Sequence, residues 1–267
     1  MRILLAGKFP PAGGAAFGGV ASWMQTVADV LSLRGHECVF WGPKLPIPSE
    51  CFDVGVIANA YSVRRIFKRC ERVICVSHGI ISEERPPPAY RSVFTSEEVR
   101  DHWAGNGAIV RQPIDLRFWN DRFREPERML LLYSYRAPDD FGLERVARRL
   151  GFRFVHLRKA THRQARDMML SASIVCASGR AALEAMACGA PTVICDYRPY
   201  NSGPLICSDL KTARAHNYSG RGGLEFTAER AIEAILSAEK MQTPREYVIE
   251  HHDAARIAGE ILEAALC

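Results

Sequence analysis

The hydrophobic positions in the first part of the chain follow two alternating patterns. Some lie in short runs rich in β-branched residues, and others recur at helical spacing. The strand-like runs are residues 2–6, 38–41, 53–58, 72–76 and 92–95, and the helical patterns are residues 20–34 and 96–104. Strands that alternate with helices predict βαβ units and a mainly parallel sheet. Residues 108–110 are expected to form a last short strand of this sheet.

A second series of the same kind follows a polar, proline-interrupted stretch, residues 112–128, which we expect to be a linker. We expect strands over residues 129–134, 154–157, 174–177 and 192–195, and helices over residues 141–150, 161–170, 180–187, 227–239 and 245–265. The sequence therefore predicts an N-terminal Rossmann-like domain over residues 1–117 and a C-terminal one over residues 118–245. A terminal helix, residues 246–267, is expected to pack back on the N-terminal domain.

The composition is that of a soluble folded protein, with 48% apolar and 24% charged residues among 267. It excludes a collagenous or low-complexity chain. The absence of an apolar run of about 18 residues and of a basic leader predicts a cytoplasmic protein. Nine cysteines without a Cys-x-x-Cys pair predict reduced thiols, and no His or Cys pair has zinc spacing, so we expect no metal site.

The net charge of +5 and an excess of arginine over lysine favour an anionic ligand or partner. Two basic groups stand out: Arg64, Arg65, Lys68, Arg69 and Arg72, and then Arg158, Lys159, His162, Arg163 and Arg166. A solvated helix face explains such groups in most proteins. A polyanionic acceptor is the alternative, with Trp103, Trp119 and Phe123 available for stacking, and nucleic acid and an anionic membrane surface both stay open.

Four glycines, Gly13, Gly14, Gly18 and Gly19, lie between the first expected strand and the first expected helix. Glycines allow the backbone to approach a ligand closely, and a helix that begins here directs its N–H groups toward that ligand. The spacing is not that of a dinucleotide fingerprint. We interpret this glycine loop as an acceptor or phosphate loop, with simple loop flexibility as the alternative.

Residues 177–196 carry the most informative pattern. Gly179 breaks a strand and begins a helix, so the first turn, with Arg180 and Ala181, is suited to an anion. Every position from 181 to 189 is small or apolar except Glu184, and a buried carboxylate must find donors. Two explanations stay open: an ion pair with Arg180 at i, i+4 spacing, or hydrogen bonds from two neighbouring hydroxyls such as a ribose diol.

The segment Glu184-Ala-Met-Ala-Cys-Gly-Ala-Pro-Thr-Val193 resembles the nucleotide-sugar signature of retaining GT-B glycosyltransferases. Ser77-His78-Gly79 is similar to the active-site turn of that family, and Gln112-Pro-Ile-Asp115 to the segment before its second domain. The resemblance covers nearly the whole chain. It implies two Rossmann-like domains that face each other across a cleft, a UDP-sugar or similar nucleotide diphosphate sugar as co-substrate, and no metal or other cofactor.

The resemblance also implies roles for individual residues. Glu184 would bind the donor ribose, and His78 would line the sugar pocket, although a purely structural histidine is the alternative. Arg136 and the helix end at Gly179 would stabilise the departing diphosphate, with Arg180, Arg158, Lys159 and Arg221 as further donor-binding candidates. The chain departs from the family in two places, because Cys176 replaces the first glutamate of the signature and Phe141 replaces a phosphate-binding lysine.

We therefore expect glycosyl transfer to a hydroxyl, with retention. The chain is short and basic, which favours a hydroxymethylated base in DNA as acceptor, as in the glucosyltransferases that decorate viral genomes. A lipid-linked or small-molecule acceptor, a nucleotide-sugar epimerase and a non-catalytic nucleotide-sugar-binding module stay open. Residues 217–223, which include Arg221, are expected to form either a surface loop or a lid over the donor.

Overall fold

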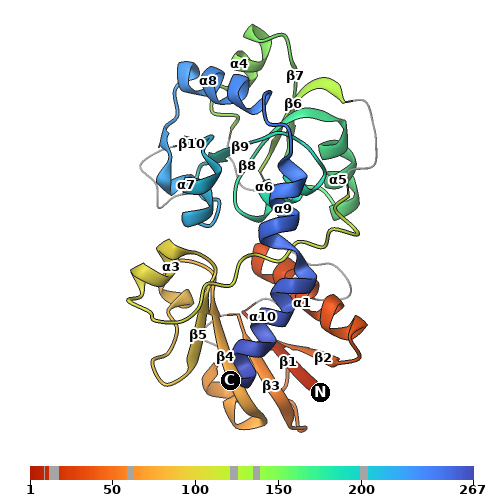
Figure 1. Cartoon of the computed structure of the whole chain (residues 1–267), viewed down its shortest axis with the longest axis vertical. Coiled ribbons are helices and arrows are strands. Elements are labelled where there is room, and N and C mark those ends of the chain that lie inside the picture. The colour runs from red at the N-terminus through yellow and green to blue at the C-terminus, as the bar shows by residue number, and fades with distance from the viewer. Residues whose placement is uncertain (9, 12–17, 59–62, 121–125, 135–138, 199–203) are drawn as a thin grey trace. The chain divides into compact units, whose positions relative to one another are not determined.

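The computed structural model describes residues 1–8, 10–11, 18–58, 63–120, 126–134, 139–198 and 204–267 (Figure 1). The contacts within the chain define two compact units. The first consists of Met1–Asp115 together with His252–Cys267, and the second of Leu116–His251.

The first unit contains a five-stranded sheet in which every neighbouring pair is parallel, in the order β2-β1-β3-β4-β5. Its strands are β1 (Arg2–Ala6), β2 (Glu37–Trp41), β3 (Phe52–Ile57), β4 (Cys70–Ser77) and β5 (Arg91–Phe94). Successive side chains of a strand point to opposite faces, so Ile3 and Leu5 face one layer and Leu4 and Ala6 the other. All four are fully buried, which explains why β1 is apolar after Arg2.

Helices cover both faces of this sheet. On one face, α1 (Gly19–Leu33) and α10 (Ala254–Leu266) pack side by side over the strands, as Figure 1 shows, with Trp23 and Ile257 in the same core cluster. On the other, Ile66 of the short helix α2 (Val63–Ile66) packs with Trp41 and Phe52. The described residues of this unit also form the short helices η2 (Phe67–Arg69), η3 (Ser82–Glu84) and α3 (Glu97–His102).

The strand expected over residues 108–110 is reduced to a single bridge between Phe94 and Ile109. The N–H of Phe94 donates to Ala108 (3.0 Å), and the N–H of Val110 donates to Phe94 (2.8 Å). The segment runs very close to β5, because a Cβ on Gly107 would lie 1.8 Å from the carbonyl oxygen of Ser92. Only glycine fits at that position.

The second unit contains a six-stranded sheet in the order β11-β10-β9-β8-β6-β7. Its strands are β6 (Glu127–Tyr133), β7 (Arg153–Leu157), β8 (Ala172–Ala177), β9 (Thr192–Asp196), β10 (Leu205–Cys207) and β11 (Leu224–Glu225). The first four are parallel, whereas β10 and β11 are antiparallel. The helices are α4 (Leu143–Arg149), α5 (His162–Ser171), α6 (Arg180–Ala187), α7 (Leu210–Ala215), α8 (Ala228–Ala238) and α9 (Pro244–His252). Figure 1 shows α4 and α8 beside each other, and both pack on one face of this sheet. Each of the two sheets, with its helices, is Rossmann-like.

Two parts of the second unit differ from the expectation. The stretch from residue 198 to residue 223 contains β10, α7 and the short helix η4 (Gly220–Gly222). The single helix expected over residues 245–265 is instead two helices, because Asp253 ends α9 and caps α10 through a 2.9 Å hydrogen bond from the N–H of Ala255. Asp253 also bridges to Ile114.

The expected linker is anchored to the rest of the protein rather than free. Ile114 is fully buried, and its N–H donates to the carbonyl of His252 (2.8 Å). Farther along, Trp119 is 3% exposed, and its carbonyl accepts a hydrogen bond from Arg245 (2.8 Å). Trp119 therefore cannot serve as the stacking surface that we expected, while Phe123 lies outside the described residues. Within the described ranges, no helix has both the length and the apolar character needed to cross a bilayer.

Candidate functional site

The strongest candidate site in the second unit is the N-terminal end of α6, which follows β8 directly. Gly179 precedes the helix with φ 60° and ψ −136°, a conformation that is unfavourable for residues with a Cβ. No atom lies within 4 Å of the place where its Cβ would be, so the backbone conformation, not space, demands glycine. The N-terminus of a helix carries partial positive charge, and this end of α6 is therefore suited to an anion.

Glu184 lies one turn into α6 and is buried, as expected. Its side chain is 6% exposed and that of Arg180 is 8% exposed, and Nε of Arg180 donates to Oε1 of Glu184 at 2.8 Å. The ion pair proposed from the i, i+4 spacing is therefore present. Burial raises the pKa of Glu184 above its ordinary value, and the neighbouring Arg180 guanidinium only partly opposes this shift.

Tyr133 is a neighbour of Glu184 that sequence reasoning missed. It is the last residue of β6, the strand next to β8. Burial, together with the charge of Glu184, raises the pKa of Tyr133 to about 12, so the phenol is neutral and able to donate a hydrogen bond. Its position at the carboxyl end of a central parallel strand was the signal that could have identified it.

The segment from residue 217 to residue 223 packs against the same end of the sheet. The N–H of Gly179 donates to the carbonyl of Tyr218 (2.6 Å), and the N–H of Gly220 donates to Oδ2 of Asp196 (2.8 Å). Tyr218 and Ser219 are each 1% exposed, so the surface-loop alternative is wrong for this part of the segment. The Tyr218 hydroxyl lies 2.9 Å from the hydroxyl of Tyr247 on α9.

Asp196 holds this segment in place from the end of β9. Its carboxylate is completely buried and accepts hydrogen bonds from Nε of Arg198 at 2.8 Å to each oxygen. Burial alone would raise the pKa of Asp196, but the Arg198 guanidinium and the Gly220 N–H outweigh it and lower that pKa below its ordinary value. Arg221 follows Gly220 in η4 and is half-buried.

The other cationic candidates are placed differently. Arg158 and Lys159 are exposed and follow β7, the edge strand, which β6 separates from β8. Two strand spacings amount to about 10 Å, so these side chains approach α6 only by reaching across the sheet. Arg166 is not a solvated cation, because its guanidinium lies 5.0 Å from the ring centroid of Phe118 and its side chain is 14% exposed. Arg136 lies outside the described residues.

In the first unit, His78 follows β4 at the carboxyl end of the sheet. Its backbone N–H donates to Oε2 of Glu84 (3.2 Å), and its ring meets that of Trp23 edge-on at 4.9 Å between centroids. The next residue, Gly79, accepts a hydrogen bond from Nε1 of Trp103 (2.9 Å). Glu84 is 6% exposed, so a buried carboxylate and two tryptophans fix the His78–Gly79 turn.

The glycine loop and the first basic group also belong to this unit. Gly18 and Gly19 are exposed at the start of α1, while Gly13 and Gly14 lie outside the described residues. Arg65 and Arg69 of the first basic group donate to the carbonyls of Pro43 and Ser49, each at 3.1 Å, and so fasten a neighbouring segment.

Arg72, in contrast, is exposed on β4. Among the residues that the structure describes, no group of three or more His, Cys, Asp or Glu side chains is arranged to hold a metal ion.

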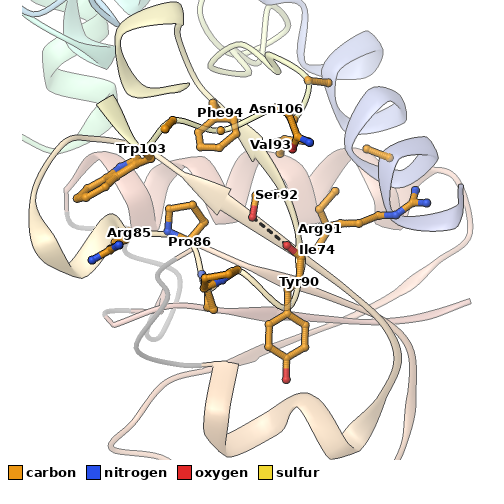
Figure 2. A pocket seen from close by; sticks show the side chains of 17 residues that line it. Ile74, Arg85, Pro86, Tyr90, Arg91, Ser92, Val93, Phe94, Trp103 and Asn106 are labelled. Carbon is orange, nitrogen blue, oxygen red and sulfur yellow. Dashed lines mark hydrogen bonds between the residues drawn. The ribbon is translucent and has the colours of Figure 1, made fainter. Parts of the chain in front are cut away.

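A cavity of about 470 Å³ in the first unit was not foreseen (Figure 2). It lies along β5, between the proline-rich residues 85–90 and the segment from Trp103 to Ala108. No sequence pattern indicates this cavity, because its walls come from the close pairing of that segment with β5.

Comparison with solved structures finds a similar fold in several glycosyltransferases. AviGT4, a glycosyltransferase involved in avilamycin A biosynthesis, is similar over 99% of this chain and 96% of its own, with a TM-score of 0.67 and 14% identity. An alpha-glucosyltransferase in complex with UDP and a 13-mer DNA that contains an HMU base is similar over 100% of both chains (TM-score 0.59, 10% identity).

The same fold also occurs in an enzyme with a different reaction. UDP-GlcNAc 2-epimerase from Neisseria meningitidis, bound to UDP-GlcNAc, is similar over 100% of both chains with a TM-score of 0.51 and 11% identity. No protein-family model matches the chain, and no curated protein matches it in sequence. At these identities the similarity establishes the two-Rossmann-domain fold, and the reaction has to be argued from the site.

Proposed function

We propose that this protein is a glycosyltransferase that moves a sugar from a UDP-sugar to a hydroxyl acceptor, with retention and without a metal ion. The observation that carries the proposal is the buried Glu184 carboxylate directly behind the N-terminal end of α6. A nucleotide diphosphate offers the two matching groups, a ribose diol for the carboxylate and a dianionic diphosphate for the helix end.

Each oxygen of Glu184 has a separate task in this proposal. Oε1 accepts from Arg180, which keeps the carboxylate compensated while the site is empty. We assign Oε2 to the ribose hydroxyls of the donor. Tyr133, held neutral by burial and by the charge of Glu184, is suited to donate to the nucleotide.

The transfer breaks the bond between the anomeric carbon and the β-phosphate oxygen and forms a bond from that carbon to the acceptor oxygen. The departing UDP takes the electron pair of the broken bond, and its phosphate oxygen accepts the proton that the acceptor hydroxyl loses. The helix end at Gly179 and Ala181 would stabilise the charge that develops on the diphosphate, with Arg136 and Arg221 as the cations of the site. His78 would contact the sugar.

For the acceptor, we propose a hydroxymethylated base in DNA. A net charge of +5 suits a polyanionic acceptor, and the similar alpha-glucosyltransferase was solved with UDP and DNA. A lipid-linked or small-molecule acceptor is the second candidate. An epimerase is the third, favoured by the fold of the UDP-GlcNAc 2-epimerase, and a binding module is the fourth, favoured by Cys176 and Phe141 at two family positions.

The test is nucleotide release from UDP-, GDP-, ADP- and dTDP-sugars, with and without hydroxymethylated DNA, together with thermal stabilisation by each nucleotide. We expect UDP to stabilise the protein and hydroxymethylated DNA to stimulate UDP release. Stabilisation without any release would contradict the transferase reaction on DNA and leave the donor site intact. An absence of stabilisation by every nucleotide would contradict the assignment of Glu184.

A further inference from the structure

The cavity along β5 is formed by backbone geometry, and its shape is therefore defined by the fold. A Cβ on Gly105 would lie 2.2 Å from the Phe94 ring, so the segment on that side is held tightly against β5. Ala104 adopts a positive φ of 49°, which turns the chain from α3 into this segment. The opposite wall is residues 85–88, three of which are prolines with restricted backbones.

The lining of the cavity is cationic and aromatic. It includes Arg85 and Arg91, both exposed, and the rings of Trp103 and Phe94, whereas none of its lining residues is acidic. Figure 2 shows Arg85, Pro86 and Trp103 grouped at one end of the cavity. A flat ring that carries a negative group close by is the ligand with matching chemistry, because the ring can stack on tryptophan and proline while arginine binds the anion.

This chemistry favours a nucleotide over a lipid surface. Membrane binding relies on apolar side chains that protrude from the protein and enter the bilayer, whereas the aromatic side chains here line a hollow. The volume, about 470 Å³, is within the range of small-ligand sites and is adequate for one nucleotide unit.

Trp103 also connects the cavity to the candidate sugar contact. Its Nε1 donates to the carbonyl of Gly79 at 2.9 Å, one residue after His78. A group that stacks on Trp103 therefore contacts the side chain that holds the His78–Gly79 turn in place. If the acceptor is a nucleic acid, the nucleotides next to the one in the cavity would lie close to that turn.

We propose that this cavity is an acceptor subsite that binds one nucleotide of a nucleic acid, with the base against Trp103 and Pro86 and the phosphate on Arg85. The inference rests on the proposed function, since it names the part of the first unit that would hold the DNA acceptor beside the modified base.

Intrinsic fluorescence offers a direct probe of this subsite. The chain has four tryptophans, and Trp23, Trp41 and Trp119 are 0%, 1% and 3% exposed. Trp103 is the remaining one and is half-buried. Stacking of a base on Trp103 is therefore expected to quench the fluorescence of the intact protein when a single-stranded oligonucleotide of about 12 residues is added. Trp103→Phe is expected to remove this quenching.

Binding constants of a labelled oligonucleotide test the individual contacts. We expect Arg85→Gln to weaken binding several-fold and to reduce the slope of log K against log salt by about 1, and Trp103→Ala to weaken binding about tenfold. Trp103→Phe, which keeps a ring, should bind the oligonucleotide within about threefold as tightly as the unchanged protein. Arg34→Gln is the matched control, since Arg34 is an exposed arginine of the same unit outside the cavity and outside both basic groups, and it should bind as the unchanged protein does.

The outcomes separate this inference from the proposed function, because UDP stabilisation is measured on the same preparations. Stabilisation by UDP with no oligonucleotide quenching, or equal weakening by Arg85→Gln and Arg34→Gln, would overturn the subsite and leave the transferase proposal in place. Quenching by phosphatidylglycerol vesicles but not by the oligonucleotide would overturn it in favour of a membrane surface. Quenching that depends on Arg85 without any effect of nucleotides would support the subsite and overturn the proposed transfer.

Discussion

The N–H of Gly179 donates a 2.6 Å hydrogen bond to the carbonyl of Tyr218, and both residues have positive φ, 60° and 54°. This bond joins the start of α6 to a segment that lies almost forty residues further along the chain. A positive φ is costly for a non-glycine residue such as Tyr218, and the burial of its side chain offsets that cost. The two residues together define how the N–H groups of α6 are presented.

Gly179→Ala should therefore weaken donor binding more than its small volume suggests. The new methyl group meets no atom within 4 Å, so the penalty is backbone strain, about 1–3 kcal/mol. Relief of that strain would rotate the first turn of α6 away from the diphosphate. We expect a fall in melting temperature and at least tenfold weaker UDP binding by calorimetry, and unchanged UDP affinity would contradict a diphosphate site at this helix end.

Glu184→Ala should abolish donor binding and also destabilise the fold. Arg180 would be left buried and uncompensated, which costs about 3–5 kcal/mol in comparable buried pairs. The matched control is Glu144→Ala on α4, because Glu144 and Arg148 form an exposed i, i+4 pair that contributes only a few tenths of a kcal/mol. Thermal melts with and without UDP measure both effects, and wild-type stabilisation of Glu184→Ala by UDP would show that the carboxylate has no part in binding.

The raised pKa of Glu184 gives a pH dependence whose sign differs between stability and binding. Because the folded state favours the protonated carboxyl, its contribution to stability is complete below the ordinary pKa of 4.5 and is lost as pH rises through the higher folded value. Unfolding by urea between pH 4 and 7 should show the unchanged protein losing stability relative to Glu184→Gln as the pH increases. A difference that stays constant with pH would contradict the shift.

Binding of UDP-glucose should change in the opposite direction. Ribose hydroxyls donate to the ionised carboxylate, so affinity should decrease as the pH falls through the raised pKa of Glu184. UDP-glucose is the suitable probe, because both of its phosphates are esterified and stay ionised in this range. Glu184→Gln should bind weakly at every pH, and a parallel pH dependence in that variant would assign the effect to another group.

Several parts of this structure follow from local sequence pattern, and others do not. The helical spacing of apolar residues predicted α6 with its observed bounds, Arg180–Ala187. The burial of Glu184 followed from the small and apolar residues around it. The short strand β10 was missed, because three residues give no periodic signal. It is held by pairing with β9 and by the contact of Gly220 with Asp196, which only the folded chain provides.

The same limit applies to the candidate sites. Tyr133 and Tyr218 reach the start of α6 from distant parts of the chain, and no spacing in the sequence connects them with Gly179. Trp119 was expected to be available for stacking beside the basic groups. It is buried because the residues around it are anchored by Arg245.

His78→Ala should separate catalysis from donor binding. The ring packs on Trp23 at the carboxyl end of the first sheet, whereas the groups that we assign to the nucleotide belong to the second unit. We expect UDP to stabilise this variant as it does the unchanged protein, while the rate of sugar transfer falls at least tenfold. His36→Ala, on the connection between α1 and β2, is the control and should leave the rate unchanged. Equal rates in both variants would support the structural interpretation of His78.

Asp196→Asn should weaken the attachment of the segment that contains Tyr218 and Gly220. The amide loses the charge that Arg198 neutralises, and we expect a loss of about 2 kcal/mol at neutral pH. Because the folded protein lowers the pKa of Asp196, the stabilisation is complete above the ordinary value of 3.8 and is lost as pH falls through the lower folded value. Urea unfolding should therefore show a difference between the two proteins that is constant from pH 7 to about pH 4 and shrinks in stronger acid. If the difference instead grew as the pH fell, the ion pair with Arg198 would not be what holds this segment.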